Sequence, residues 1–167
     1  RHEEFSGKKI RYYDAETGES YIPYVIETSI GVDRMVLQVL SAGYQEEKLE
    51  NGEERTVLSI PAPLAPVKAA VLPLVKKDGL PEIAHRIKNT LRYDYNIQYD
   101  EKDSIGKRYR RQDAIGTPLC ITIDHQSAED GTVTVRDRDT MRQERVHIEA
   151  IPALVESKAG MRALLDK

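Results

Sequence analysis

The sequence has little of the residues on which several classes of protein depend. Among its 167 residues there is one cysteine, Cys120, so an internal disulfide is excluded. The four histidines are scattered, and they form neither a Cys/His cluster with the spacing of a zinc site nor a Ser/His/Asp or Cys/His pattern for nucleophilic catalysis. We therefore expect a reducing, cytoplasmic setting and no bound metal.

Long apolar runs and targeting signals are also missing from the sequence. No run approaches the ~18 apolar residues of a membrane span, and residues 1–4 (RHEE) lack the basic, apolar and small residues of a secretory signal. A phosphate-binding loop of the form G-x-x-x-x-G-K-[ST] does not occur. We expect no membrane partner. Because the chain begins in a polar stretch without methionine, we also expect it to be a piece of a longer protein.

The charges are unevenly distributed along the chain. The whole sequence carries 28 acidic and 25 basic residues, and this net charge of -3 by itself argues against a nucleic-acid partner. Residues 1–60, however, hold 12 acidic and 7 basic residues, whereas residues 61–167 hold 16 acidic and 18 basic residues. The change falls at residues 61–66 (PAPLAP), where three prolines favour an extended connection. The sequence therefore predicts two domains, 1–60 and 61–167.

In the first part, the pattern predicts a strand followed by a helix and a loop. Residues 21–29 (YIPYVIETS) are rich in β-branched and aromatic residues, which favours a strand. From Val32, apolar residues recur at helical spacing as far as Gly43. Residues 45–56 are acidic and polar and contain an Asn51-Gly52 turn signal, so we expect an exposed loop there.

In the second part, strands and helices alternate before several strands follow one another. This order favours an α/β fold with a mixed, mostly parallel five-stranded sheet flanked by helices. A turn is expected at Asp130-Gly131, between the third and fourth strands. The predicted strands cover 67–75, 96–100, 119–124, 132–136 and 141–148, and the predicted helices begin at Pro81, Ser104 and Pro152.

The stretch Ser104–Asp113 (SIGKRYRRQD) holds four cations and one anion around one aromatic ring. On a helix, Ile105, Tyr109 and Gln112 share one face, so the charged side chains can stay outside. The planar guanidinium donates two parallel hydrogen bonds, which suits phosphates and base edges. The alternative is a solvated helix face without a ligand.

Two further groups of residues have a functional and a plain interpretation. Arg136, Arg138 and Arg142 alternate with aspartates, as in a surface ion-pair network, yet an arginine held by a carboxylate is also oriented to meet a base. In the first part, Glu27, Ser29, Gly31 and Arg34 surround the predicted turn and could bind an ammonium group and a phosphate. Equally, Glu27 could be a charge at the N-terminus of the helix and Arg34 a surface residue.

Four blocks of sequence together carry a resemblance to a known family. Residues 21–34 (YIPYVIETSIGVDR) resemble the third signature motif of class II aminoacyl-tRNA synthetases, in the form of the dimeric glycyl-tRNA synthetases. Residues 66–73 (PVKAAVLP), 104–116 and 135–141 (VRDRDTM) resemble the C-terminal anticodon-binding domain of the same enzymes. The resemblance implies an anticodon-binding domain at 61–167, preceded by a strand and helix from the antiparallel catalytic sheet.

The resemblance also implies roles for individual residues. In the parent ligase, which joins glycine to ATP with Mg²⁺ and transfers it to the glycine tRNA, the glycine site would comprise Glu27, Thr28, Ser29, Ile30 and Gly31. The ATP site would comprise Gly31, Val32, Asp33 and Arg34. The anticodon surface would comprise Arg108, Tyr109, Arg110, Arg111, Asp113, Asp124, Arg136 and Arg138, with Tyr109 either stacking or packing.

The resemblance is incomplete in two respects. Thr28 stands where many relatives have proline, and no part of the chain resembles the first two class II motifs. We therefore expect a homodimeric, cytoplasmic parent, and expect these 167 residues alone neither to hold a cofactor nor to form glycyl-adenylate. Two alternatives are an accessory module that binds RNA or a protein partner without ligase activity, and a small-molecule-binding α/β domain with an incidental basic helix.

Overall fold

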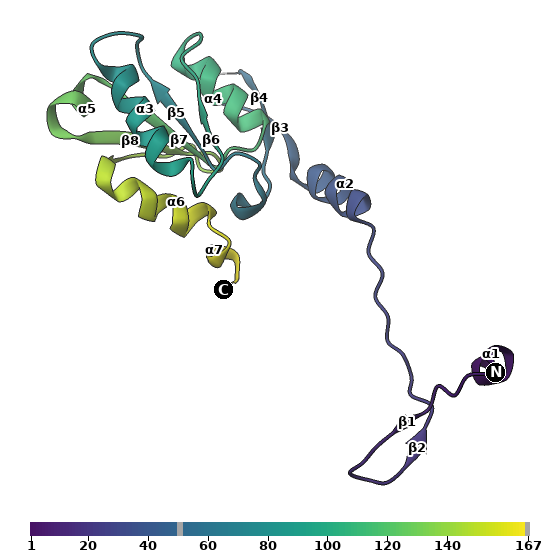
Figure 1. Ribbon diagram of the computed structural model, residues 1–167. Coiled ribbons are helices and arrows are strands. Elements are labelled where there is room, and N and C mark those ends of the chain that lie inside the picture. The colour runs from purple at the N-terminus through teal and green to yellow at the C-terminus, as the bar shows by residue number, and fades with distance from the viewer. Residues whose placement is uncertain (50–51, 166–167) are drawn as a thin grey trace. The chain divides into compact units, whose positions relative to one another are not determined.

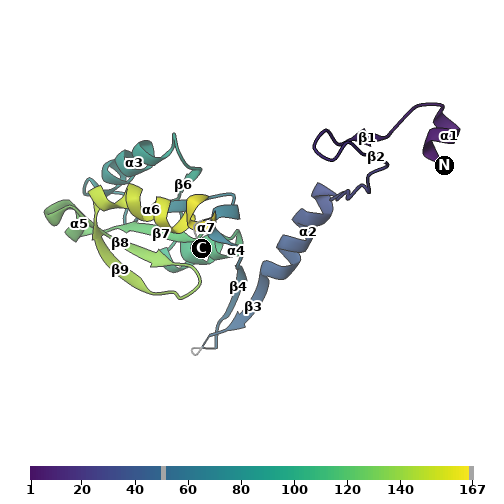
Figure 2. The same ribbon diagram turned by 90° about the horizontal axis from the view of Figure 1, so that it is seen from below.

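The computed structural model describes residues 1–49 and 52–165 (Figures 1 and 2). The chain divides into two compact units, residues 1–35 and residues 36–167. The domain boundary predicted at Pro61 does not coincide with this division, and the two domains 1–60 and 61–167 stay a prediction. Within the described residues, no helix is long and apolar enough to cross a membrane.

The first unit contains little regular structure. It holds α1 (His2–Ser6), an antiparallel pair of β1 (Tyr12–Tyr13) and β2 (Ser20–Tyr21), and the start of α2 (Val32–Gly43), which continues into the second unit. The predicted helix is confirmed, but the predicted strand over 21–29 is wrong beyond Tyr21. Residues 22–31 pair with no strand among the described residues, and Tyr24 and Ile26 are exposed. A high strand propensity does not by itself form a strand, because a strand also needs a neighbouring strand to pair with.

The second unit begins with a hairpin where an exposed loop was expected. β3 (Tyr44–Lys48) and β4 (Glu54–Leu58) pair antiparallel, so the loop prediction for 45–56 is wrong. Of the turn signal Asn51-Gly52, only Gly52 lies within the described residues, and it has a positive φ. Arg55 and Val57 are buried, whereas their neighbours on β4 alternate to the exposed side. Burial of every second residue explains why this polar sequence forms a strand.

The five-stranded sheet of the second unit has the mixed form that the sequence predicts. Its order is β6-β5-β7-β8-β9, in which β5 is parallel to β6 and β7, and β7, β8 and β9 are successively antiparallel. The strands are β5 (Ala69–Pro73), β6 (Ile97–Tyr99), β7 (Leu119–Ile123), β8 (Thr132–Asp137) and β9 (Gln143–His147).

Helices cover the two faces of this sheet differently. The core of one face is formed with α3 and α6, and the smaller core of the other face with α4. The connection from β5 to β6 and the one from β6 to β7 run in opposite directions along the sheet, so right-handed crossovers place α3 and α4 on opposite faces. The helices are α3 (Leu80–Leu91), α4 (Ile105–Ala114), α5 (His125–Asp130), α6 (Ile151–Ala159) and α7 (Arg162–Leu165), with 3-10 turns η1 (Ala62–Leu64) and η2 (Ile148–Ala150).

Two details of the helices differ from expectation. The sequence pattern did not predict α5, which replaces a simple turn between β7 and β8 and is followed by Gly131 as its C-cap. Asp124 begins it with a capping box, in which the Asp124 carboxylate accepts from the Ser127 N–H and the Ser127 hydroxyl accepts from the Asp124 N–H. Six mostly polar residues give no apolar periodicity to detect. The last predicted helix is interrupted at Gly160, which separates α6 from α7.

Candidate nucleic-acid interface

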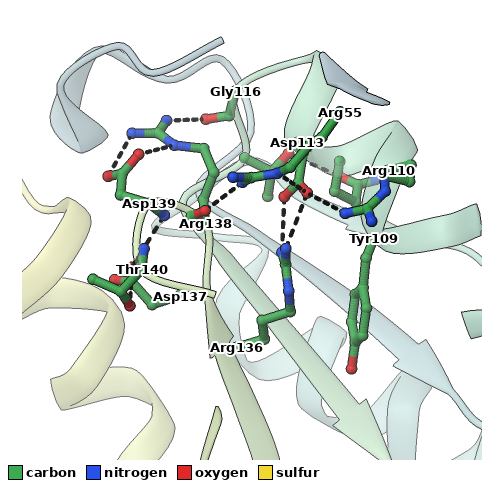
Figure 3. Close-up of polar contacts among 12 residues, drawn as sticks. Arg55, Tyr109, Arg110, Asp113, Gly116, Arg136, Asp137, Arg138, Asp139 and Thr140 are labelled. Atoms are coloured by element: carbon green, nitrogen blue, oxygen red, sulfur yellow. Dashed lines mark hydrogen bonds and ion pairs between the residues drawn. The ribbon is translucent and has the colours of Figure 1, made fainter. Parts of the chain in front are cut away.

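The centre of the candidate site is a carboxylate buried between α4 and β8. Asp113 is fully buried, and Arg136 donates to both of its oxygens, from Nη1 to Oδ1 at 2.8 Å and from Nη2 to Oδ2 at 3.0 Å (Figure 3). A second guanidinium reaches the same carboxylate, because Arg55 Nε donates to Asp113 Oδ2 at 2.9 Å. These three side chains are at most 3% exposed, so as they lie they cannot touch a base.

Strand alternation explains how Arg136 comes to lie beneath α4. Arg136 on β8 is opposite Cys120 on β7, and Cys120 belongs to the core that packs against α4. Residues paired across a ladder point to the same face, so Arg136 also points to α4. Its guanidinium carbon lies 4.9 Å from the centroid of the Tyr109 ring, which is a cation–π geometry.

The positive charge of Arg55 is balanced by a second carboxylate, which lies on the hairpin. Arg55 Nη1 donates to Glu47 Oε2 on β3 at 2.7 Å, so each of the two buried guanidiniums has a carboxylate. Burial alone would lower the pKa of Arg55, but the hydrogen bonds and charges of Asp113 and Glu47 outweigh burial and raise it. Arg55 therefore stays charged at neutral pH.

Arg138 is also buried, and its hydrogen bonds connect the turn after β8 to segments that are distant in the sequence. Its Nη1 donates to the Gly116 carbonyl and its Nη2 to the Ile60 carbonyl, each at 2.8 Å. Asp139 pairs with the same guanidinium and accepts a hydrogen bond from Ser59 at 2.9 Å. Arg138 therefore connects the turn after β8 to the end of α4 and to the segment that follows the hairpin.

Arg108 is buried at the carboxyl end of the parallel strands. Its Nη1 donates to the carbonyls of Pro73 at 2.6 Å and Asp100 at 3.2 Å, and its Nη2 donates to Leu74 at 3.3 Å. Burial lowers the pKa of this guanidinium, and its Nε has no hydrogen-bond partner among the described residues. Arg108 thus fixes α4 to the loops that follow β5 and β6.

Tyr109 packs inside rather than pointing to solvent. Its ring lies against the small core of Ala70, Leu72 and Cys120, and its hydroxyl shares a hydrogen bond with Thr122 Oγ1 at 2.7 Å. Burial raises the pKa of Tyr109. Of the two roles open to Tyr109, packing is the one that this arrangement provides.

The cations that face solvent are on the outer side of α4. Arg111 donates from Nη2 and Nε to Asp100 Oδ2 at 2.6 and 3.1 Å and from Nη1 to Asp103 Oδ2 at 2.9 Å, yet its side chain remains 42% exposed. Arg110 is 34% exposed, with its Nη1 3.8 Å from Asp113 Oδ2 and its Nη2 3.5 Å from Glu53 Oε2. Lys107 is exposed on the same helix. These three side chains can reach a phosphate backbone.

Asp124 has a partner that the sequence analysis missed. Arg145 on β9 donates from Nη1 and Nη2 to the two Asp124 oxygens at 2.6 and 2.9 Å. These hydrogen bonds, together with those from the backbone and side chain of Ser127, lower the pKa of Asp124 to about 2. Arg145 also reaches Thr132 and Thr134, so the outer strands present polar side chains on the face that α4 occupies. The available sequence signal for this polar face was the alternation of residues 132–136, because it places both threonines on the same face of the strand as Arg136.

Comparison with known proteins agrees with this geometry. The family described as "Anticodon binding domain" matches residues 68–158, from the residue before β5 to α6. The chain belongs to this family. Over 95% of its length it is 55% identical to a glycine--tRNA ligase of Geobacillus kaustophilus and 52% identical to one of Lachnospira eligens. It spans about a third of these relatives, 34% of each.

A solved structure supports the fold of this anticodon-binding domain. The RNA binding domain of threonyl-tRNA synthetase from Cryptosporidium parvum superposes with a TM-score of 0.54 at 25% sequence identity. The match covers 60% of this chain and 26% of that one. The five-stranded sheet and its helices are thus an arrangement that an RNA-binding domain also uses.

The residues assigned to glycine and ATP lie outside the anticodon-binding domain. Residues 27–31 have no regular structure and are exposed, and Val32, Asp33 and Arg34 begin α2. Among the described residues, the side chains of Glu27, Ser29 and Arg34 make no hydrogen bond or ion pair. Their assignment to the glycine and ATP sites therefore stays a prediction.

Proposed function

We propose that this chain binds the anticodon loop of the glycine tRNA as part of a glycine--tRNA ligase. The observation that carries the proposal is the family match over 68–158, because that range contains α4 with its outward-facing cations. The identity of more than half over 95% of the chain to a glycine--tRNA ligase supports glycine as the amino acid. The excess of acidic over basic residues lies before Pro61, whereas residues 61–167 hold 16 acidic and 18 basic residues.

In this proposal, the exposed cations contact the RNA and the buried arginines position the elements that carry them. Lys107 and Arg110 neutralise phosphates of the RNA backbone, and the release of counterions from these phosphates contributes to the affinity. Arg111 reads a base or grips a phosphate with a guanidinium that Asp100 and Asp103 already orient. Arg108, Arg136 and Arg138 are buried, so their contribution is to fix α4 and the strand ends that carry the exposed groups. Asp113 and Asp124 hold arginines rather than bases.

The ligase activity of the parent is proposed from the relatives. Glycine and ATP would give glycyl-adenylate and pyrophosphate, and the glycyl group would pass to the 3′ end of the tRNA in a homodimeric, cytoplasmic enzyme. Residues 27–31 would line the glycine site, and residues 31–34 the ATP site. Among the residues the structure describes, no group of three His, Cys, Asp or Glu side chains is placed to hold a metal ion.

Filter binding over a salt series tests the proposal. The 167-residue chain is titrated against a glycine tRNA transcript, with a transcript for another amino acid as the control. We expect the logarithm of the binding constant to fall linearly with the logarithm of salt concentration, and the glycine transcript to bind more tightly throughout. Binding that does not depend on salt, or no binding of either transcript, would reject the anticodon interface.

A further inference from the structure

Arg55 is a buried arginine that lies outside the matched family range. It belongs to β4, before residues 68–158, yet its side chain is 1% exposed and contacts Asp113, 58 residues further along the chain. A buried arginine needs partners for its charge and its donors. Those partners come from three different elements.

Each of three nitrogens of Arg55 has its own acceptor. Nε donates to Asp113 on α4, Nη1 to Glu47 on β3, and Nη2 to the Arg138 carbonyl in the turn after β8. Lysine has a single nitrogen on a flexible stem and cannot reproduce three bonds in these directions. The geometry therefore requires arginine here, and not only a positive charge.

The carboxylate that Arg55 holds is shared with residues of the proposed RNA surface. Asp113 accepts two hydrogen bonds from Arg136, and Arg110 Nη1 lies 3.8 Å from its Oδ2. Arg110 is one third exposed, and its Nη2 also lies 3.5 Å from Oε2 of the exposed Glu53, so both of its carboxylate contacts are long and the guanidinium can turn to a phosphate. Arg55 satisfies the same oxygen from the opposite side at 2.9 Å, as Figure 3 shows.

We propose that Arg55 is a positioning residue for RNA binding, which occupies Asp113 and so leaves Arg110 available to the RNA. Being buried, Arg55 does not contact RNA itself. When Arg55 is removed, the Asp113 carboxylate loses one of its two close cations. Arg110 is the nearest replacement, and moving inward takes it away from the phosphate backbone. This inference rests on the proposed function, since it assumes that the chain binds tRNA through α4.

The inward movement of Arg110 makes a prediction that loss of stability alone does not. A protein that neutralises one phosphate fewer has a salt dependence shallower by about 0.7–0.9 in log–log slope. A change that only lowers stability reduces the folded fraction and leaves the slope of the folded molecules unchanged. The salt slope therefore separates the two roles.

The test compares variants of the 167-residue chain in binding a glycine tRNA transcript over a salt series. Arg55→Gln removes the buried guanidinium, and Arg55→Lys keeps the charge but not the three bonds. Arg92→Gln is the matched control, because it removes an exposed cation next to α3, on the other side of the sheet. Circular dichroism identifies a temperature at which every variant is folded, and binding is measured there.

We expect Arg55→Gln to weaken binding about tenfold at low salt and to flatten the slope, Arg55→Lys to do the same to a smaller extent, and Arg92→Gln to do neither. If Arg55→Gln does not fold, the lysine variant decides. A folded Arg55 variant with the affinity and slope of the wild type would overturn the inference, as would an equal effect in Arg92→Gln. Failure of the wild type itself to bind the transcript would instead reject the proposed function.

Discussion

Arg136 and Asp113 form a two-point ion pair in the interior of the protein, with Nη1–Oδ1 and Nη2–Oδ2 distances of 2.8 and 3.0 Å. The pair joins β8 to α4. These two elements hold six of the eight residues that the resemblance assigned to the anticodon, and Arg138 directly follows β8. The same pair places the Arg136 guanidinium over the Tyr109 ring. The shape of the proposed RNA surface therefore depends on a contact that RNA does not reach.

Breaking this pair should destabilise the protein strongly. Asp113→Ala leaves two buried guanidiniums without their shared carboxylate, and we expect a loss of roughly 3–5 kcal/mol in the free energy of unfolding. Urea unfolding followed by circular dichroism measures it. Lys76→Ala, which removes an exposed cation 3.7 Å from Glu101, is the control and should leave the midpoint unchanged. A small effect of Asp113→Ala would show that the cluster does not hold α4 to the sheet.

Gly116 should tolerate no side chain, because of both its backbone and its neighbour. Its φ is +81°, and an added Cβ would lie 2.9 Å from the backbone oxygen of Leu58 on the hairpin. Gly131 has a similar φ of +69° with nothing within 4 Å, so Gly131→Ala costs only the left-handed strain, about 1–2 kcal/mol. Thermal unfolding should show a larger loss for Gly116→Ala. Equal losses would mean that the hairpin does not pack against this turn as described.

Cys120 should be inert in the folded protein. Burial in the core beneath α4 raises the pKa of its thiol to about 12, so almost no reactive thiolate forms at neutral pH. A thiol reagent such as dithionitrobenzoate should react slowly under native conditions and rapidly in denaturant. Native reaction as fast as that of free cysteine would contradict the described packing of β5, β7 and α4.

The Asp124–Arg145 pair should make the protein sensitive to acid. The hydrogen bonds from Arg145, together with those from the backbone and side chain of Ser127, lower the pKa of Asp124 from 3.8 to about 2. As the pH falls through this interval, the unfolded chain takes up the proton first, so the stabilisation is complete above about pH 4 and is lost towards pH 2.

The variant Asp124→Asn removes this titration. Between about pH 6 and pH 3, the wild type should lose more stability than Asp124→Asn, by on the order of 1 kcal/mol. Urea unfolding at the two pH values measures the difference. Parallel losses in the two proteins would show that Arg145 does not hold the carboxylate in solution.

Local pattern predicted most of the elements of the second unit. The helix after Ser104 and the strands around 69–73 and 119–123 are confirmed, because apolar spacing and glycine signals belong to the segment itself. The strand expected at 22–29 and the loop expected at 45–56 failed for one shared reason. Whether a segment pairs depends on a partner elsewhere in the chain, which its own residues do not describe.

The candidate site was predictable in composition but not in burial. The sequence showed that arginines gather at 107–111 and 136–142, and it showed aspartates beside them. It could not show that Arg136 pairs with Asp113, 23 residues away, or that Arg55 arrives from the hairpin. Since burial of an arginine requires a tertiary carboxylate or carbonyl partner, the division into exposed and buried cations appears only in the fold.

The proposal that the chain reads the anticodon is tested by changing only the anticodon. Two RNA stem-loops are compared in binding to the 167-residue chain at one salt concentration: that of the glycine tRNA, and the same stem-loop with its anticodon bases replaced by adenines. Base contacts contribute roughly 1–3 kcal/mol each, so we expect the substituted stem-loop to bind at least about tenfold more weakly. Equal affinity for the two stem-loops would contradict the proposal, because contacts to the phosphate backbone alone would then explain the binding.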